Sequence, residues 1–192
     1  MKLTLGIIIL SAATLISSGV NAQKGGGDGN TFEVGTMTVS IGAGLGRSAY
    51  GGVGVYGGAG LDYGTGIGVK AVIERGMWQL GPGVLSLGLE AGGSFSSTNY
   101  TGYGYHSNII IAAVRAAYHF GWNVNKLDTY AGVSVGPGFR NYGYSGNKAN
   151  DIVVSPGIFV GGTYFFSPNI GVNVEAGYDI TEIQGGIIFK LK

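Results

Sequence analysis

The sequence predicts an all-β protein, namely a closed, antiparallel, up-and-down transmembrane β-barrel of about eight strands. Three observations predict this fold. Charged residues make up only 11% of the chain, against about 25% in soluble globular proteins. Apolar residues alternate with small or polar ones in segments of about ten residues, as they do in barrel strands. After the N-terminus no segment offers the roughly 18 apolar residues that a spanning helix needs, and open sheet edges are unstable in lipid, so the strands must close.

The N-terminal residues predict export. Lys2 precedes an apolar stretch over 3–16, and small or apolar residues follow at 20–22 (Val-Asn-Ala). This order is typical of a secretory signal peptide, and the stretch is short for the alternative, a membrane anchor. We therefore expect a signal peptide over 1–22, a flexible Gly-rich lead-in over 23–35 and the barrel domain over 36–192.

The strands are predicted from an alternation with a period of two, which is the side-chain period along a strand. In the segment 84–95, for example, Leu85 and Leu87 share one face, whereas Ser86 and Gly88 share the other. The other predicted strands are 38–47, 66–78, 108–120, 129–140, 151–166, 170–179 and 185–192. The segment 151–166 is apolar on both faces in places, so the alternation there does not decide which face points outward.

The predicted connections alternate in length. Short links lie at 79–83, 121–128 and 167–169, and longer ones, rich in Gly, Tyr, Ser and Asn, lie at 48–65, 96–107 and 141–150. Bacterial outer-membrane barrels have short periplasmic turns and long external loops. The asymmetry therefore predicts a location in the bacterial outer membrane.

Alternation alone also fits a soluble barrel whose apolar face points inward. Glycine favours the membrane version, because on a small face it makes room in a narrow lumen, whereas on a solvated strand it only weakens the strand. Aromatic residues favour it too, since they gather near the short links, as in the interfacial belts of membrane barrels. The predicted belt consists of Trp78, Tyr118, Phe120, Trp122, Tyr130, Tyr164, Phe166 and Phe189.

The charged residues provide the third argument. Three positive and three negative residues lie on the small or polar faces, and we expect them to form a network of paired charges that fills the lumen: Lys70, Glu74, Glu90, Arg115, Glu175 and Lys190. Adjacent strands should bring Glu90 to Arg115 and Glu175 to Lys190, because a buried ion without a partner is costly. In a soluble barrel the same residues would be ordinary exposed charges.

In these features the chain resembles the small outer-membrane β-barrel family, which includes OmpX and the transmembrane domain of OmpA. The resemblance covers nearly all of the chain after the signal peptide and is one of pattern. It implies insertion by the barrel-assembly machinery and contact with outer-membrane lipid and lipopolysaccharide. The last strand departs from the commonest form of the family, because it ends Phe189-Lys190-Leu191-Lys192 instead of in an aromatic residue.

No catalytic, cofactor or metal site is expected, and the protein is not predicted to be an enzyme. The G-x-G-x-x-G match at 52–57 lies in a chain with 40 glycines and outside any βαβ unit. His106 and Ser107 would point to opposite faces of a strand, which disfavours a hydrolytic pair. His119 should join the lumen network near the short links. No His, Asp or Glu cluster has metal-ligand spacing, and a net charge of +1 gives no basis for nucleic-acid binding.

Tyrosines in the long loops are candidates for surface recognition, because Tyr among Gly, Ser and Asn suits adaptable binding. They are Tyr100, Tyr103, Tyr105, Tyr142 and Tyr144. The alternative is membrane-interface anchoring and loop filling. The predicted function is a structural or adhesin-like role, with a surface protein or glycan as a possible ligand. A narrow channel for small solutes is the main alternative, and a soluble secreted barrel that binds an apolar ligand is a third.

Overall fold

A computed structural model describes residues 31–46, 66–100, 103–120, 122, 124–144 and 147–191; of residues 98–100, 103–105, 142, 144, 147 and 148 it describes the backbone alone. The predicted signal peptide, residues 23–30 of the lead-in, the 48–65 loop and the G-x-G-x-x-G match lie outside these residues. In the described ranges no helix is long and apolar enough to cross a membrane.

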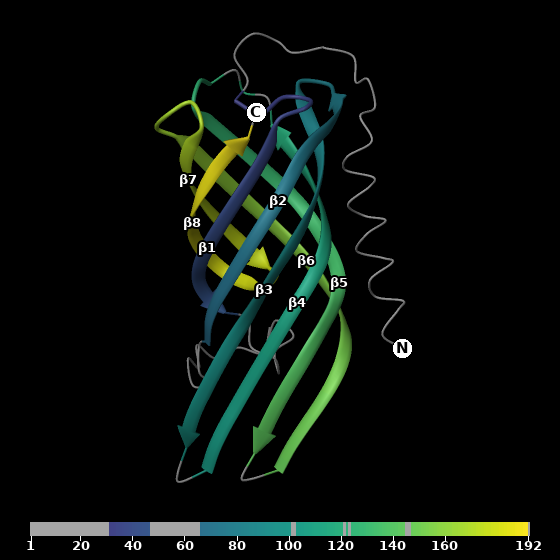
Figure 1. Ribbon diagram of the computed structural model, residues 1–192, viewed down its shortest axis with the longest axis vertical. Helices are drawn as coiled ribbons and strands as arrows, with labels where there is room; N and C mark the ends of the chain where they lie inside the picture. The colour runs from purple at the N-terminus through teal and green to yellow at the C-terminus, as the bar shows by residue number, and fades with distance from the viewer. Residues whose placement is uncertain are drawn as a thin grey trace, which may run out of the picture.

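Eight antiparallel strands form a closed barrel in sequence order, and β8 pairs back onto β1 (Figure 1). This confirms the predicted up-and-down barrel. The strands are β1 (Met37–Gly46), β2 (Gly66–Leu80), β3 (Gly83–Tyr100), β4 (Tyr103–Phe120), β5 (Leu127–Tyr144), β6 (Asn147–Phe165), β7 (Ile170–Tyr178) and β8 (Thr181–Leu191).

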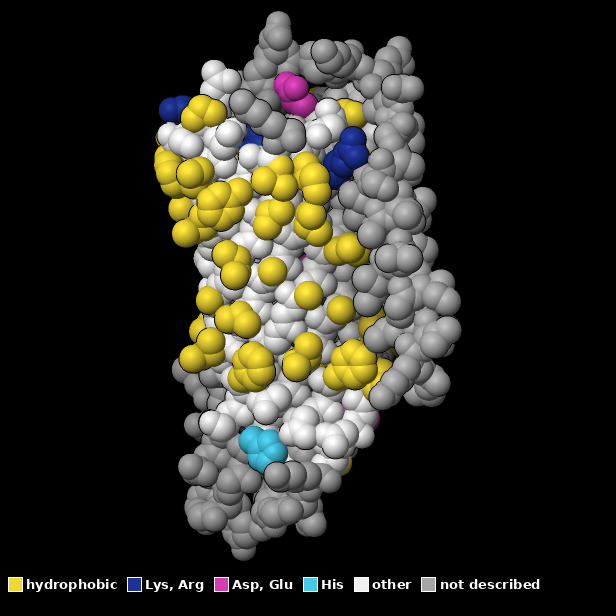
Figure 2. Space-filling model, in the orientation of Figure 1, with side chains coloured by type: hydrophobic (Ala, Val, Ile, Leu, Met, Phe, Trp, Pro, Cys, Tyr) yellow, Lys and Arg dark blue, Asp and Glu magenta, His cyan; other side chains and the backbone are white. Residues whose placement is uncertain are grey.

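Each strand turns an apolar face outward and a small or polar face inward. On β2, for example, Ile67 is 69% exposed and Lys70 only 2%. Large apolar side chains are exposed on all eight strands, and Figure 2 shows them spread over the barrel wall. For β6 the sequence does not decide which face points outward. In the structure Val154 and Ile158 are exposed and Phe159 is buried. The exterior is therefore the apolar band of a membrane barrel.

The strands differ in length, which makes one end of the barrel uneven. Strands β3 to β6 have 18 or 19 residues, whereas β1, β7 and β8 have 9 to 11. The β3–β4 and β5–β6 hairpins therefore project beyond the other strands, at the bottom of Figure 1. We call this the tall end. The opposite end, which holds the connections β2–β3, β4–β5 and β6–β7, is called the short-turn end.

Two predicted long loops are wrong. The residues at 96–107 and 141–150 mostly continue the strands, with Ser96 opposite Ser107 and Asn141 opposite Asn150. Their Gly, Ser, Asn and Tyr content is typical of loops, but cross-strand pairing outweighs this local preference. Across the paired β5 and β6 strands, Nε of Arg140 donates to Asp151 at 2.9 Å.

The β7–β8 connection folds into the barrel. Asp179 and Ile180 are both buried, and β8 begins at Thr181, earlier than the predicted Gly185. The extra pairing joins Ile183 of β8 to Leu45 of β1. The short strands and this tight connection bring two side chains from a turn into the barrel interior.

Candidate functional site: the barrel interior

Ionisable side chains gather inside the barrel, from its short-turn end up to the level of the β7–β8 connection. We call them the interior charge cluster: Lys70, Glu74, Glu90, Arg115, His119, Asp128, Glu175 and Asp179. All eight are buried. Five of the six residues predicted to line the lumen belong to the cluster, and they reach it from β2, β3, β4 and β7 because each occupies an inward position of its strand.

Arg115 of β4 lies at the centre of the cluster. Its Nε is 2.8 Å from Glu74, its Nη1 is 3.2 Å from Glu90, and its Nη2 is 3.1 Å from Glu175. The guanidinium carbon also lies 3.9 Å from the centre of the Phe159 ring. A planar guanidinium has donors on three sides, so one arginine can join carboxylates from three strands. The predicted pair of Glu90 and Arg115 is present.

Lys70 of β2 forms the second centre, nearer the tall end. Its Nζ contacts Glu175, lies 2.5 Å from Asp179 and is 3.7 Å from Glu90. Ser134 of β5 donates a hydrogen bond to Asp179 at 3.2 Å. Glu175 is thus shared between Lys70 and Arg115, which links the two centres.

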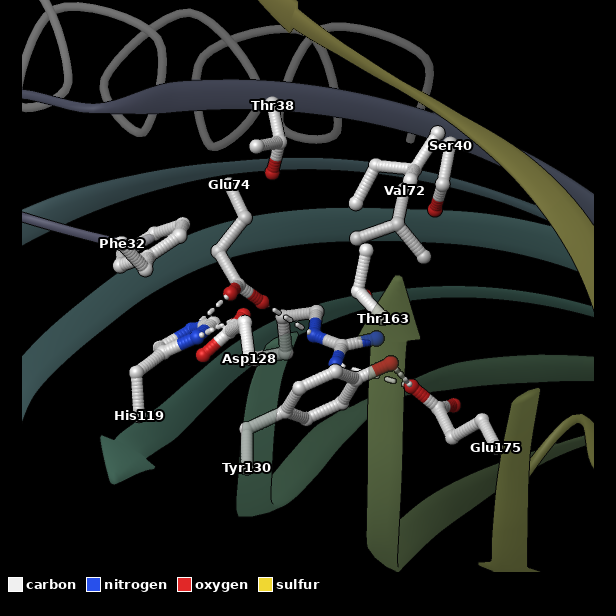
Figure 3. Close-up of a pocket in the computed structure, with 12 residues that line it drawn as sticks. Phe32, Thr38, Ser40, Val72, Glu74, His119, Asp128, Tyr130, Thr163 and Glu175 are labelled. Atoms are coloured by element: carbon white, nitrogen blue, oxygen red, sulfur yellow. Dashed lines mark hydrogen bonds and ion pairs between the residues drawn. The ribbon is translucent and has the colours of Figure 1, made fainter. Parts of the chain in front are cut away.

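His119 of β4 forms the third centre, nearer the short-turn end (Figure 3). Its Nδ1 lies 2.8 Å from Asp128 and its Nε2 lies 2.6 Å from Glu74. Because carboxylates only accept hydrogen bonds, both ring nitrogens must donate, and the ring is a cation. This supports the expectation that His119 joins the lumen network.

Ser86, His119 and Asp128 have the composition of a catalytic triad. Ser86 Oγ lies 3.2 Å from His119 Nε2. However, that nitrogen already faces Glu74, and the Ser86 hydroxyl donates to the carbonyl oxygen of Ala117 at 3.0 Å. A nucleophilic serine needs a base with a free lone pair. The geometry therefore does not activate Ser86, and Ser86 is fully buried.

Lys190 does not join the cluster, and its predicted pairing with Glu175 is wrong. Its ammonium donates to the carbonyl oxygen of Thr31 at 2.7 Å and lies 4.6 Å from the centre of the Phe165 ring. The register explains the difference. Glu175 lies opposite Gln184 on β8, and Lys190 is six residues further along that strand, or ~20 Å at the usual rise per residue.

Tyr130 is also placed differently from the prediction. It was assigned to the aromatic belt, but it is buried in the lumen and donates to Glu175 at 3.1 Å. It shares the inward face of β5 with Asp128 and Ser134. Tyr118 is half-buried, and the other six predicted belt residues are exposed on the outside near the short-turn end: Trp78, Phe120, Trp122, Tyr164, Phe166 and Phe189.

Apolar side chains lie at both ends of the charge cluster. At the short-turn end, the ring of Phe32 stacks on His119 with 3.6 Å between ring centres and 5° between ring planes. At the tall end, Ile180 packs with side chains from β4: Ile109, Ile111 and Ala113. The cluster is therefore separated from both mouths of the barrel by apolar groups.

A cavity of about 20 Å³ lies beside the cluster. Its lining includes Thr38, Thr163 and Tyr130, three of the residues labelled in Figure 3. Thr163 Oγ1 is buried without a hydrogen-bond partner among the described atoms. A space of this size holds about one water molecule, so the interior has no room for a larger solute at this point.

The tyrosines predicted for recognition lie on the projecting hairpins rather than in loops. Tyr100 is opposite Tyr103, and Tyr105 is opposite Tyr144, while Tyr142 lies opposite Ser107. The backbone thus places the five residues on neighbouring strands at the tall end. Their side chains lie outside the described atoms, and their recognition role stays a prediction.

The sequence reasoning missed two members of the cluster, Asp128 and Asp179, and the two apolar ends, Phe32 and Ile180. Asp128 was detectable, because it lies one strand period before Tyr130 on the inward face. Phe32 was placed in the flexible lead-in, but residues 31–36 have a defined position against the barrel. Within the described residues, no group of three His, Cys, Asp or Glu side chains could hold a metal ion.

Comparisons with known proteins give similarity to solved structures only. No family model and no curated protein matches the chain. Ail, the attachment invasion locus protein of Yersinia pestis, aligns with 10% identity and a TM-score of 0.48 over 82% of this chain and 96% of Ail. Neisserial surface protein A (NspA) aligns with 10% identity and a TM-score of 0.47 over 81% of this chain and 92% of NspA. Ail in complex with the heparin analogue sucrose octasulfate gives 11% identity, a TM-score of 0.45 and coverage of 82% and 96%. At these identities no functional residue transfers from those proteins to this chain.

Proposed function

We propose that the protein is an integral barrel of the bacterial outer membrane with a structural or adhesin-like surface role, and that its lumen is plugged by the interior charge cluster. The observation that carries the proposal is the distribution of polarity. All eight strands expose large apolar side chains, and eight ionisable side chains are buried inside. A water-soluble domain has the opposite distribution, whereas a lipid-facing barrel requires this one.

The packed interior supports a plugged lumen over a channel. Arg115 and Lys70 together bind carboxylates from both sides of the barrel, and the neighbouring cavity is about 20 Å³. A hydrated ion would have to separate these pairs, which costs several kcal/mol because each charge would lose its partner in a confined space. Side chains fill the interior of most eight-stranded barrels.

The uneven ends support a surface role. The longest connections of outer-membrane barrels lie outside the cell, and here the longest connection, over 47–65, joins the tall ends of β1 and β2. The tall end would therefore face outward and raise the β3–β4 and β5–β6 hairpins above the lipid. Their outer parts are rich in Ser, Asn, Gly and Tyr. This composition suits contact with a surface protein or a glycan, beside lipopolysaccharide at the apolar band. Insertion would require the barrel-assembly machinery.

Two measurements on one sample test the proposal. Protein from the membrane fraction is run on an SDS gel with and without boiling, and is then reconstituted into a planar bilayer. We expect a heat-dependent mobility shift and no stepwise current. A general porin, whose barrel encloses a water-filled channel, is reconstituted in the same way as the positive control for conductance.

Each other outcome supports a different function. A mobility shift together with stepwise current from the unaltered protein would favour a narrow channel for small solutes. Soluble protein without a mobility shift would overturn the membrane location and favour a secreted barrel that binds an apolar ligand.

A further inference from the structure

The segment over residues 31–36, which we call the N-terminal segment, lies across the short-turn end of the barrel. Phe32 is 4% exposed, although it belongs to no strand. Its ring lies flat against His119 and forms part of the wall of the cavity beside the charge cluster (Figure 3). An aromatic face against a cationic ring is attractive. The segment therefore has a specific seat inside the barrel mouth.

The segment folds into a tight turn that positions Phe32. The amide of Thr36 donates to the carbonyl oxygen of Glu33 at 3.0 Å, and the amide of Glu33 donates to Thr36 Oγ1 at 3.1 Å. Gly35 has φ +89°, a left-handed conformation that glycine adopts without strain. These contacts within the segment hold its six residues in a defined turn.

Few contacts hold this turn to the barrel. The amide of Gly35 donates to the carbonyl oxygen of Gly76 at 2.9 Å, and the amide of Gly76 donates back to Thr36 at 2.9 Å. Lys190 binds the carbonyl oxygen of Thr31, and the Thr31 hydroxyl donates to the carbonyl oxygen of Val124 at 3.3 Å. A side chain at Gly76 would collide with the segment, since its Cβ would overlap the carbonyl oxygen of Glu33 and lie 3.1 Å from the Phe32 ring. The barrel wall is thus shaped to receive the segment.

Barrel closure does not depend on the N-terminal segment. β1 begins at Met37, and its pairing with β2 and β8 starts at that residue. The segment can therefore leave its seat without breaking the strand ladders. Ile180 differs, because it lies between two paired strands, β7 and β8, and cannot leave without disturbing them.

We propose that the N-terminal segment is a reversible stopper, which seals the charge cluster from the short-turn side and admits water and small solutes to it when it detaches. This inference rests on the proposed function in one respect, because it takes the lumen to be closed at the tall end. Detachment exposes His119, Asp128 and Glu74, and Ile180 still blocks passage through the barrel. The opened state is an accessible pocket and not a pore.

The test uses the absence of cysteine from the chain. Thr38→Cys places a single thiol in the cavity wall, next to the seat of Phe32. Its reaction with a small positively charged methanethiosulfonate is timed in the full-length protein in detergent micelles, in three backgrounds: Phe32, Phe32→Ala and Val34→Ala. Val34 belongs to the same segment but does not line the cavity.

We expect the Phe32→Ala background to react at least about tenfold faster, because modification of a buried thiol follows the population of the opened state. The Val34→Ala background should keep the slow rate. Ser107→Cys, at the tall end, should react at one rate with Phe32 and with Phe32→Ala. Equal rates for Thr38→Cys with Phe32 and with Phe32→Ala would overturn the stopper.

A second measurement covers the case in which Thr38→Cys does not fold. The chain has two histidines, so the ring protons of His119 are followed by NMR with His106 as the internal reference. Phe32→Leu should move the His119 signals by removing the stacked ring, and should leave those of His106 in place. Unchanged His119 signals would refute the stacking of Phe32 on His119.

The mobility shift on SDS gels separates the two proposals. Loss of the shift in the unaltered protein contradicts the membrane barrel itself. A retained shift with fast thiol labelling in every background contradicts the stopper alone. A retained shift, labelling that depends on Phe32 and no current in either background is the expected result.

Discussion

Arg115 shows how a single residue organises the barrel interior. Its three carboxylate partners come from β2, β3 and β7, so the side chain connects opposite walls. In a buried position each carboxylate depends on this cation for its charge balance. Removal of one partner from such a group is far more costly than replacement of the whole group by apolar residues.

The first prediction is that Arg115→Glu strongly impairs folding. The variant would place a fourth carboxylate among Glu74, Glu90 and Glu175, with an expected cost of ~3–5 kcal/mol or more. Arg140→Glu is the matched control, because the Arg140 side chain is 28% exposed, against 2% for Arg115, and exposed pairs contribute about 0–1 kcal/mol. The measurement is the fraction of heat-shiftable protein after refolding into detergent. Equal folded fractions for the two variants would contradict a buried cluster.

Glycines inside the barrel have a steric role that a second prediction tests. A Cβ at Gly88 would overlap the carbonyl oxygen of Ile73 and lie 3.2 Å from Arg115 Cγ, whereas a Cβ at Gly185 would meet no atom within 4 Å. Gly88→Ala should lower the free energy of unfolding by ~1–3 kcal/mol through overpacking. Gly185→Ala should be neutral or slightly stabilising. Urea unfolding in detergent micelles measures both, and a greater loss for Gly185→Ala would refute the assignment of faces.

At the scale of elements, unequal strand lengths explain what closes the tall end. At the tall end, β7 and β8 stop short of the tips of the longer strands, and the connection between them is only two residues long. Such a short connection turns inward and brings Asp179 to Lys70 and Ile180 to the β4 side chains. The same inequality leaves the longer β3–β6 strands to build the projecting hairpins.

A third prediction belongs to this connection. Ile180→Ala should cost about 2–5 kcal/mol, because it leaves a cavity against Ile109 and Ile111 that the strands cannot collapse to fill. Ile183→Ala is the control, since Ile183 is exposed on the lipid-facing side and lipid can occupy the vacated space. The midpoints of thermal loss of the mobility shift compare the two. A control variant that unfolds first would contradict the apolar seal at the tall end.

At the scale of the whole molecule, polarity is arranged for lipid outside and for ion pairs inside. An apolar exterior would be unstable in water, because large apolar side chains are exposed on every strand and are spread over the wall (Figure 2). In a bilayer the same surface is stabilising, and the closed ladder leaves no strand edge unpaired between β1 and β8 in lipid.

The fourth prediction separates lipid from water as the surroundings. Val174 of β7 is 59% exposed. In a soluble protein Val174→Lys would change stability by no more than about 0.5 kcal/mol, whereas near the middle of a bilayer it should cost ~2–4 kcal/mol. Folding equilibria in phospholipid vesicles, with Val174→Leu as the control, provide the measurement. An unchanged free energy of folding in Val174→Lys would exclude a lipid-facing wall.

Local patterns in the sequence predicted the fold and most of the charge cluster. The period of two assigns faces without knowledge of neighbours, so Lys70, Glu74, Glu90, Arg115 and Glu175 were placed inside correctly. Residues whose placement depends on strand pairing were harder to predict. The hairpins at 96–107 and 141–150 resemble loops in composition, and only the partner strand extends them. Tyr130 was assigned to the belt because a tyrosine suits both a membrane interface and a polar lumen. Only its position on the strand distinguishes the two.

The sequence by itself determined the class of barrel, the number of strands and which side chains face inward, because these depend on alternation along each strand. The tertiary structure alone decided which inward side chains meet. Strand register separates Lys190 from Glu175, the short β7–β8 connection delivers Asp179 and Ile180, and Phe32 gains its seat from β2 and β4. These contacts join residues far apart in the chain, and their geometry is set by closure of the barrel, which no local pattern encodes.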